Sequence, residues 1–323
     1  MWRRADHVRQ LDYVARQVAR LVARDGISAE AALALIEASE VAGNRDACKQ
    51  FRSALSGAAT PAADGALRTL WQLLATVRST AAGRVDRCIL SFVHSAQLAH
   101  IAVRDVVQGL RASTSYSAAL LVVLLVLASV MEIYVVPSYA SLFKSVDAPL
   151  PPFTRALVGS PWPLIAAFLV GATLCIFTVW LASAVARSAS NIAPLPRVLL
   201  ATPLLQDLSR RLDNLLYLQY LAALLHGAVP VEAAQDAAAR IIDPQGGYRP
   251  RAPLAAFLEG AARLQLLTDE IATQLIEQSQ QLAVAADTLG RRVTLLVRLV
   301  IYSFIALFVL AMYEPMFKLG SVY

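Results

Sequence analysis

The chain has few charged residues and contains long stretches with almost none. Of its 323 residues 16% are charged and 57% are hydrophobic, whereas a soluble globular protein has about 25% charged residues. In the three stretches 116–136, 162–186 and 294–313 the only charged residues are Glu132 and Arg298. Each stretch is about as long as the roughly 20 residues that a helix needs to cross a bilayer. The sequence therefore predicts an all-α membrane protein with three transmembrane helices.

Residues typical of catalysis, metal binding and cross-linking are also scarce. The three cysteines (Cys48, Cys88 and Cys175) are scattered, which argues against a disulfide framework or a metal site. The sequence has no Gly-Lys-Ser/Thr phosphate loop and no His-Glu-x-x-His, and its four histidines form no ligand cluster. Asp269 and Glu270 are adjacent, but their place at the start of a predicted helix explains them through the helix dipole. We therefore expect a protein that is not an enzyme and that binds no cofactor or metal.

The net charge of +6 is distributed as in a membrane protein rather than a nucleic-acid-binding protein. Arginines are concentrated on one side of the apolar stretches, namely Arg104 and Arg111, Arg187 and Arg197, and Arg291 and Arg292, whereas the loop 137–161 has only Lys144 and Arg155 as cationic residues. Cationic residues concentrate on the cytoplasmic side of membrane spans. This pattern predicts cytoplasmic helical domains at 1–115 and 187–293, a periplasmic loop at 137–161 and a periplasmic tail at 314–323. We expect no nucleic-acid partner.

The two charges inside the predicted spans are of interest because such charges are costly and often functional. Arg298 lies near the cytoplasmic boundary of the third span, so its long side chain can reach the lipid headgroups. We favour this interpretation over a functional partner. Glu132 lies near the opposite boundary of the first span, so we do not expect it to pair with Arg298. A role for Glu132 in coupled transport is the less favoured alternative.

The segments outside the spans are predicted to be helical, since no alternation of apolar and polar residues indicates a strand. Gly26 suits the end of a first helix, and Ser28 can cap the next one. The remaining expected helices are 29–40, 66–80 and 84–111 in the first domain, and 205–226, 231–242, 253–266 and 269–290 in the second. Thr268 is the expected N-cap of the last.

The two predicted domains share a short internal repeat. Gly26-Ile27-Ser28-Ala29-Glu30-Ala31-Ala32-Leu33 aligns with Ala228-Val229-Pro230-Val231-Glu232-Ala233-Ala234-Gln235. Both segments follow an apolar helix and begin another, at the same point of their domains. We expect the two segments to be structurally equivalent.

Several motifs resemble those of one family. After the first span come Val135-Val136-Pro137, Ser141-Leu142-Phe143 and Leu150-Pro151-Pro152-Phe153-Thr154; Pro203-Leu204-Leu205 opens the second domain, which continues with Leu224-Leu225-His226-Gly227-Ala228-Val229-Pro230-Val231-Glu232-Ala233; and Ala311-Met312-Tyr313-Glu314-Pro315-Met316-Phe317-Lys318-Leu319-Gly320 lies near the end. These motifs and their order are similar to those of the inner-membrane platform proteins of type II secretion and type IV pilus systems (the GspF/PilC family).

This resemblance implies a non-enzymatic, multi-pass protein of the bacterial inner membrane with a cytoplasmic N-terminus. It implies coupling of a hexameric assembly ATPase to insertion of pilin or pseudopilin subunits. Other implied partners are inner-membrane components of the same machine, the lipid bilayer and further copies of the chain. The implied interface residues are Gly26, Ile27, Leu33, Pro137, Leu150, Pro151, Thr154, Pro203, Gly227, Val229, Pro230, Tyr313, Pro315 and Phe317.

The sequence also departs from the family pattern. The family's Gly-Glu-x-x-Gly is missing, and the third span begins with Thr294-Leu295-Leu296-Val297-Arg298 instead of a Glu-Pro motif. These differences and the short chain indicate a divergent branch, such as that of type IVb pili. The alternatives are a platform protein of a tight-adherence system, a membrane receptor or transporter subunit, and an integral-membrane enzyme.

Overall fold

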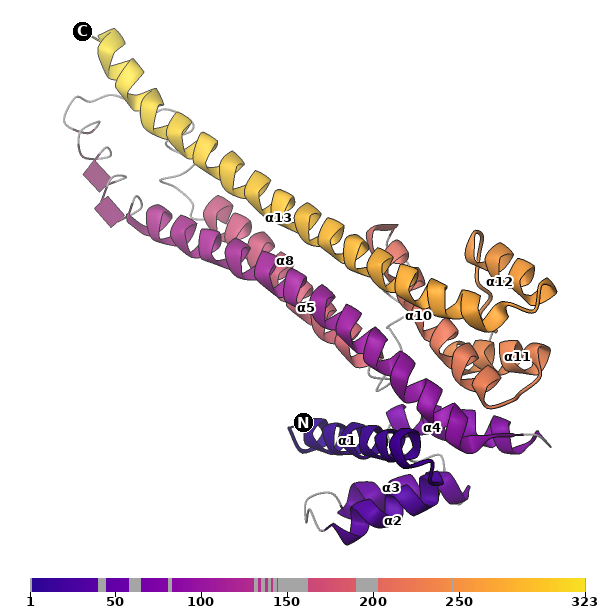
Figure 1. The fold of residues 1–323 in the computed structure, drawn as a ribbon. Helices are drawn as coiled ribbons and strands as arrows, with labels where there is room; N and C mark the ends of the chain where they lie inside the picture. The colour runs from indigo at the N-terminus through magenta and orange to yellow at the C-terminus, as the bar shows by residue number, and fades with distance from the viewer. Residues whose placement is uncertain are drawn as a thin grey trace. The chain divides into compact units, whose positions relative to one another are not determined.

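The computed structural model describes most of the chain as helices. The described residues are 2–39, 45–57, 65–80, 83–130, 133–134, 137–138, 141, 144, 162–189, 203–244 and 247–322. Their helices are α1 (Trp2–Asp25), α2 (Ala29–Ala38), α3 (Arg45–Ser56), α4 (Gly65–Arg78), α5 (Val85–Val130), α8 (Trp162–Ala189), α10 (Pro203–His226), α11 (Val231–Ile242), α12 (Leu254–Arg263) and α13 (Leu267–Val322) (Figure 1). None of the described residues forms a strand. The prediction of an all-helical protein is confirmed.

Two helices are longer than the sequence pattern predicted. α5 is continuous from Val85 to Val130, across the expected boundary between the helix 84–111 and the span 116–136. α13 is continuous from Leu267 to Val322, so the helix 269–290, the span 294–313 and most of the expected tail 314–323 form one helix. The only glycine inside α5, Gly109, adds about 1 kcal/mol of helix cost, which is too little to end a helix by itself. Both helices are drawn as unbroken ribbons in Figure 1.

The start of α13 differs from the prediction as well. The helix begins at Leu267, and the backbone N–H of Glu270 donates a hydrogen bond to the carbonyl oxygen of Leu266 (3.0 Å). Thr268 therefore lies inside the helix and is not its N-cap. The preceding turn explains this shift, because Gln265 has a left-handed backbone (φ 58°) that ends α12 immediately before α13.

The chain divides into two compact units, each made of two segments. Unit 1 consists of residues 1–106 and 184–285, and unit 2 of residues 107–183 and 286–323. The two segments predicted as separate cytoplasmic domains thus contribute to one unit, in which α4 packs against both α10 and α11. α5 and α13 each begin in unit 1 and continue into unit 2.

Helix α10 forms the centre of unit 1. Its residues 215–224 are all buried, and apart from Gln219 they are Leu, Ala or Tyr, so apolar or aromatic side chains occur on every side of this segment. Leu212, Leu215, Leu218, Leu221 and Leu224 are among the largest fully buried side chains. Burial of each such leucine contributes about 1.5–3 kcal/mol. Helices α1, α2 and α3 pack against one another, and α3 contacts α4.

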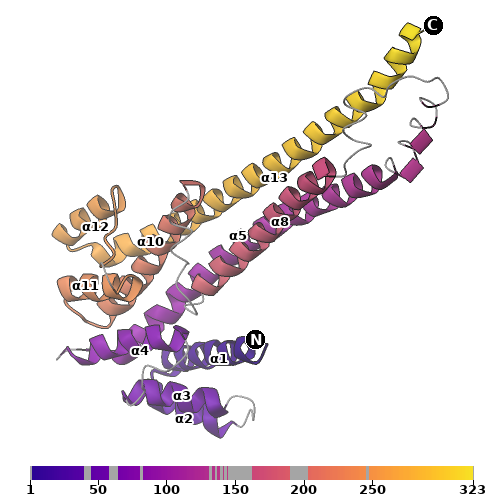
Figure 2. The same cartoon turned by 180° about the vertical axis from the view of Figure 1, so that it is seen from behind.

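In unit 2, α5, α8 and α13 pack through small and aliphatic residues. Leu121 and Leu124 of α5 form a buried cluster with Val297 and Ile301 of α13. Gly290 of α13 lies against Ser113 of α5. The residue numbers at the contacts therefore rise in the same direction along both helices, so α5 and α13 run parallel. α8 lies alongside α5 in both views (Figures 1 and 2), and a side chain at Gly171 of α8 would collide with Leu121.

One helical segment, Val85–Val126 of α5, is long and apolar enough to cross a membrane, by length and composition. A shorter apolar segment, Leu169–Ala184, lies in α8. The described residues thus contain one candidate membrane span, which agrees with the prediction of a membrane protein.

Candidate functional site

The turn between α10 and α11 is the second-repeat motif predicted from the sequence. The N–H of Val229 donates to Leu224 O (3.1 Å) and the N–H of Ala228 donates to Leu225 O (2.9 Å), the pattern of a Schellman helix end. Ala228 occupies the left-handed position of that motif (φ 62°), where glycine is usual. Pro230 is the N-cap of α11, so it precedes the helix rather than forming its first residue. The helix 231–242 begins and ends as predicted.

This turn packs against α4 and the first turns of α5. The backbone N–H of Arg84 donates a hydrogen bond to the carbonyl oxygen of Gly227 (2.9 Å). A Cβ at Gly227 would lie 2.8 Å from a methyl group of Val77 and 3.2 Å from Cβ of Cys88. Glycine at 227 therefore permits a close approach of two chain segments that are far apart in sequence.

His226, at the end of α10, adds a side-chain contact to α5. Its Nδ1 lies 2.8 Å from the carbonyl oxygen of Ala222 and 3.2 Å from Oγ of Ser91. Because a carbonyl oxygen can only accept, Nδ1 carries a proton, which it donates to Ala222 O. Ser91 lies two turns into α5.

The first-repeat motif contacts the same part of α5. Gly26 ends α1 with a left-handed backbone (φ 64°), and Oγ of Ser28 accepts from the N–H of Ala31 (3.2 Å), so both predicted roles are confirmed. The N–H of Ala29 donates to Oδ1 of Asp86 (2.8 Å). Asp86 lies in the first turn of α5, where a carboxylate also interacts favourably with the positive end of the helix dipole. Both repeat turns thus contact residues 84–91. We call this region the α5 junction.

The α5 junction contains one thiol, that of Cys88. Its side chain is fully buried. Within the described ranges, no group of three His, Cys, Asp or Glu residues could bind a metal ion.

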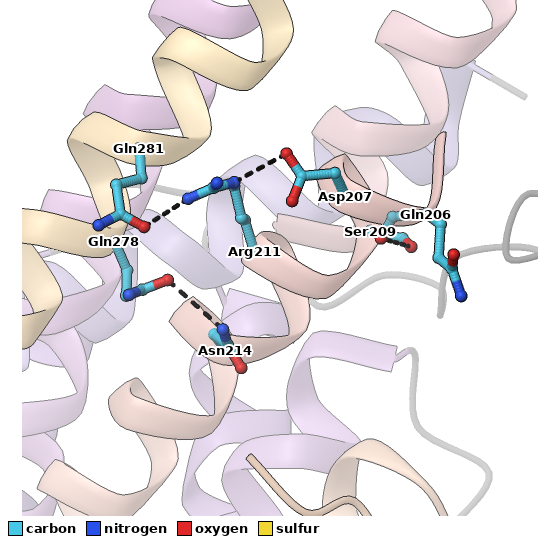
Figure 3. Close-up of polar contacts among 7 residues, drawn as sticks. All are labelled: Gln206, Asp207, Ser209, Arg211, Asn214, Gln278 and Gln281. Atoms are coloured by element: carbon cyan, nitrogen blue, oxygen red, sulfur yellow. Dashed lines mark hydrogen bonds and ion pairs between the residues drawn. The ribbon is translucent and has the colours of Figure 1, made fainter. Parts of the chain in front are cut away.

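A second group of polar contacts joins α10 to the first part of α13 (Figure 3). Arg211 donates hydrogen bonds to Gln281 of α13 and to Asp207 of its own helix, the latter at 3.1 Å. Nδ2 of Asn214 lies 3.4 Å from Oε1 of Gln278, which is buried. Tyr248, from the loop after α11, donates to Oδ1 of Asn214. These side chains connect the loop, α10 and α13.

The surroundings of these polar contacts raise the pKa values of two side chains, Asp213 and Tyr248. Burial and, to a smaller extent, the negative charge of the nearby Asp243 together raise the pKa of Asp213 to about 6. Burial also raises the pKa of Tyr248, as does the negative charge of Asp213, so its hydroxyl remains a donor. The rings of Tyr248 and Tyr217 are in contact, with centroids 5.7 Å apart.

In unit 2, the predicted span residue Arg298 lies beside an aromatic ring. Its Cζ is 5.1 Å from the centre of the Tyr116 ring of α5. Such a cation–π contact contributes about 0.5–1 kcal/mol at an exposed site. Glu132 lies outside the described residues.

The structure brings some of the predicted interface residues together and leaves others apart. Gly227 contacts the α5 junction directly, and Val229 and Pro230 belong to the same turn. Gly26 and Ile27 belong to the turn before Ala29, which contacts Asp86. Leu33 is buried in α2. Pro203 is the first residue of α10, and Pro137 is exposed in a helical turn. Tyr313 and Phe317 are exposed on α13 with ring centroids 6.4 Å apart, and Pro315 lies between them in the same helix. Leu150, Pro151 and Thr154 lie outside the described residues.

Sequence reasoning missed Arg84, Asp86 and Ser91, as well as the side chains that join α10 to α13. One local signal was available for Asp86, because an acidic residue in the first turn is typical of a helix start. No local pattern marks Asn214 or Gln278, since their roles depend on contacts between segments far apart in the sequence.

Comparison with known proteins places this chain in no family. No family model matches it, and neither the curated proteins nor the solved structures contain a match.

Proposed function

We propose that the protein is a non-enzymatic platform of a type IV pilus or type II secretion machine in the bacterial inner membrane. In this role it spans the membrane three times, with unit 1 in the cytoplasm. Unit 1 binds a hexameric assembly ATPase, and the spans contact the transmembrane helices of pilin or pseudopilin subunits.

The contact of both repeat turns with the α5 junction supports this proposal most strongly. α5 begins at this junction and contains the segment that is long and apolar enough to cross a membrane. A partner that displaces either turn would therefore act directly on the first residues of a helix that continues towards the membrane. A protein that transmits motion needs such a connection and does not need a catalytic cluster.

The contacts of α10 with α13 support the same role. Arg211 and Asn214 bind Gln281 and Gln278 near the start of the second long helix, which also continues into unit 2. Within unit 1, specific contacts thus hold the first segments of both continuous helices.

The test is the rate of ATP hydrolysis by the cognate assembly ATPase with and without the reconstituted full-length protein. We expect that the protein alone hydrolyses no ATP, co-purifies with the ATPase and changes its rate. A Gly227→Val variant, which places a branched side chain against Val77, should insert into the membrane normally but lose the effect on the rate. If the wild-type protein neither binds the ATPase nor alters its rate under any nucleotide condition, a passive scaffold for pilin subunits would be the better account.

A further inference from the structure

One face of α13 has cationic residues at one end and exposed apolar residues along the rest. In a helix, positions 291, 294, 298, 302, 305 and 309 project from the same side, because their spacings of three, four and seven residues return to one face. The residues there are Arg291, Thr294, Arg298, Tyr302, Ile305 and Val309. We call them the Arg298 face. Tyr302 is 65% exposed and Val309 43% exposed.

The guanidinium of Arg298 is positioned from the neighbouring helix. Its Cζ lies over the Tyr116 ring of α5, 5.1 Å from the ring centre. The guanidinium has five N–H donors, and an aromatic ring beneath Cζ still leaves N–H groups for an anionic acceptor. Asp287 is the one carboxylate whose side chain is described in unit 2, and it binds Arg291 at 2.8 Å. Among the described residues, then, no acidic side chain neutralises Arg298.

The order of these groups matches the order of groups in a phospholipid. Arg298 lies about 10 Å beyond Arg291 along the helix, at a rise of 1.5 Å per residue, and the apolar positions 302, 305 and 309 continue in the same direction. A phosphate near Arg298 would accept bidentate hydrogen bonds from the guanidinium. The acyl chains would then lie along Tyr302, Ile305 and Val309.

We infer that the Arg298 face binds a phospholipid of the cytoplasmic leaflet, with its phosphate on Arg298 and its acyl chains along the apolar positions. This inference rests on the proposed membrane placement of α13. It assigns to Arg298 a defined ligand in addition to general contact with the headgroup layer. Tyr116 is a positioning residue that orients the guanidinium.

Membrane placement is measured first, by whether the full-length protein stays in the membrane pellet after washing with alkaline carbonate. Its release would contradict the proposed function. Lipid binding is then measured on detergent-solubilised full-length protein by native mass spectrometry. The probes are phosphatidylglycerol, diacylglycerol with the same acyl chains, and glycerol phosphate. The Arg298 face should bind one phosphatidylglycerol saturably, because binding needs both the phosphate and the chains.

Three variants test which residues carry this binding. Arg298→Gln should weaken phosphatidylglycerol binding about tenfold, because the charge-assisted hydrogen bonds are lost. Tyr116→Leu should weaken it about threefold, because the guanidinium loses its aromatic contact. Arg292→Gln removes the same charge from a different side of α13 and should leave binding unchanged.

Four results would overturn the inference. They are an equal loss in Arg292→Gln, equal binding of diacylglycerol, equal binding of glycerol phosphate without chains, and unchanged lipid binding in Arg298→Gln. In the last case, loss of a co-purifying membrane protein would indicate that Arg298 binds a carboxylate of a partner helix instead.

Discussion

Gly26 and Ala228 have the same left-handed backbone conformation, with φ of 64° and 62°. They occupy aligned positions of the two sequence repeats. Gly26 lies between α1 and α2, and Ala228 lies between α10 and α11. Only the first position has the residue that this conformation favours, since alanine pays a steric cost there that glycine does not.

Replacement of Ala228 by glycine should therefore stabilise the protein. We expect Ala228→Gly to increase the free energy of unfolding by about 1 kcal/mol, because the strain of the left-handed alanine is removed. Ala272→Gly, at an exposed position inside α13, should instead destabilise by about 1 kcal/mol. Denaturant unfolding of both variants in detergent measures the difference. Effects of the same sign in the two variants would contradict the conformational explanation.

At Gly227 the constraint is steric. A methyl group there would lie 2.8 Å from Val77 and 3.1 Å from Leu224 O. Gly227→Ala should lower the free energy of unfolding by about 1–3 kcal/mol, the usual range for overpacking. Gly260→Ala is the control, since nothing lies within 4 Å of the added atom, and it should be neutral or stabilising. Equal effects of the two substitutions would show that the turn does not pack closely against α4.

Asp86 connects the first repeat to α5 through one hydrogen bond. Asp86→Ala should destabilise unit 1 by about 1–2 kcal/mol, because the N–H of Ala29 loses its acceptor. Glu232→Ala removes a first-turn carboxylate of α11 that is exposed, and it should cost a few tenths of a kcal/mol through the helix dipole alone. Hydrogen exchange at the Ala29 amide gives a local readout, which should be faster in Asp86→Ala only.

The raised pKa of Asp213 predicts a dependence of stability on pH. Its pKa rises from 3.8 to about 6 in the folded state, so between these values the folded protein binds more protons than the unfolded chain. The free energy of unfolding should therefore decrease as the pH rises from 4 to 6, and stay lower above that, by roughly 2 kcal/mol. Asp213→Asn should remove this decrease and be the more stable protein at pH 7. Thermal unfolding at pH 4 and pH 7 compares the two; identical pH dependence would contradict the assignment.

The proposed topology predicts which side of the membrane two inserted cysteines reach. In a cysteine-free background, Asp147→Cys should react with a membrane-impermeant thiol reagent in intact spheroplasts, while Gln245→Cys should react only after lysis. The reason is the concentration of arginines at the cytoplasmic ends of the predicted spans. The reverse pattern would overturn both the orientation and the cytoplasmic placement of unit 1.

Local features of the sequence predicted several helix ends, though not the start of α13, because the causes of those ends are local. Gly26, Ser28 and the start of α11 follow from backbone conformation and capping within a few residues. The continuity of α5 and α13 was missed because an apolar span and an amphipathic helix differ in composition but share one backbone conformation. The contact between Gly227 and Arg84 could not be predicted, since no sequence pattern specifies which distant segments meet.

The discontinuous make-up of unit 1 has a consequence for its synthesis. Val77 is fully buried, and part of its cover is the turn at Gly227. That turn is translated about 150 residues later, which at 5–20 residues per second takes roughly 8–30 s. During this interval two apolar stretches also leave the ribosome and the α4 surface lacks its partner. Nascent chains arrested before Gly227 should therefore bind chaperones through α4, and release should follow translation of α10 and α11.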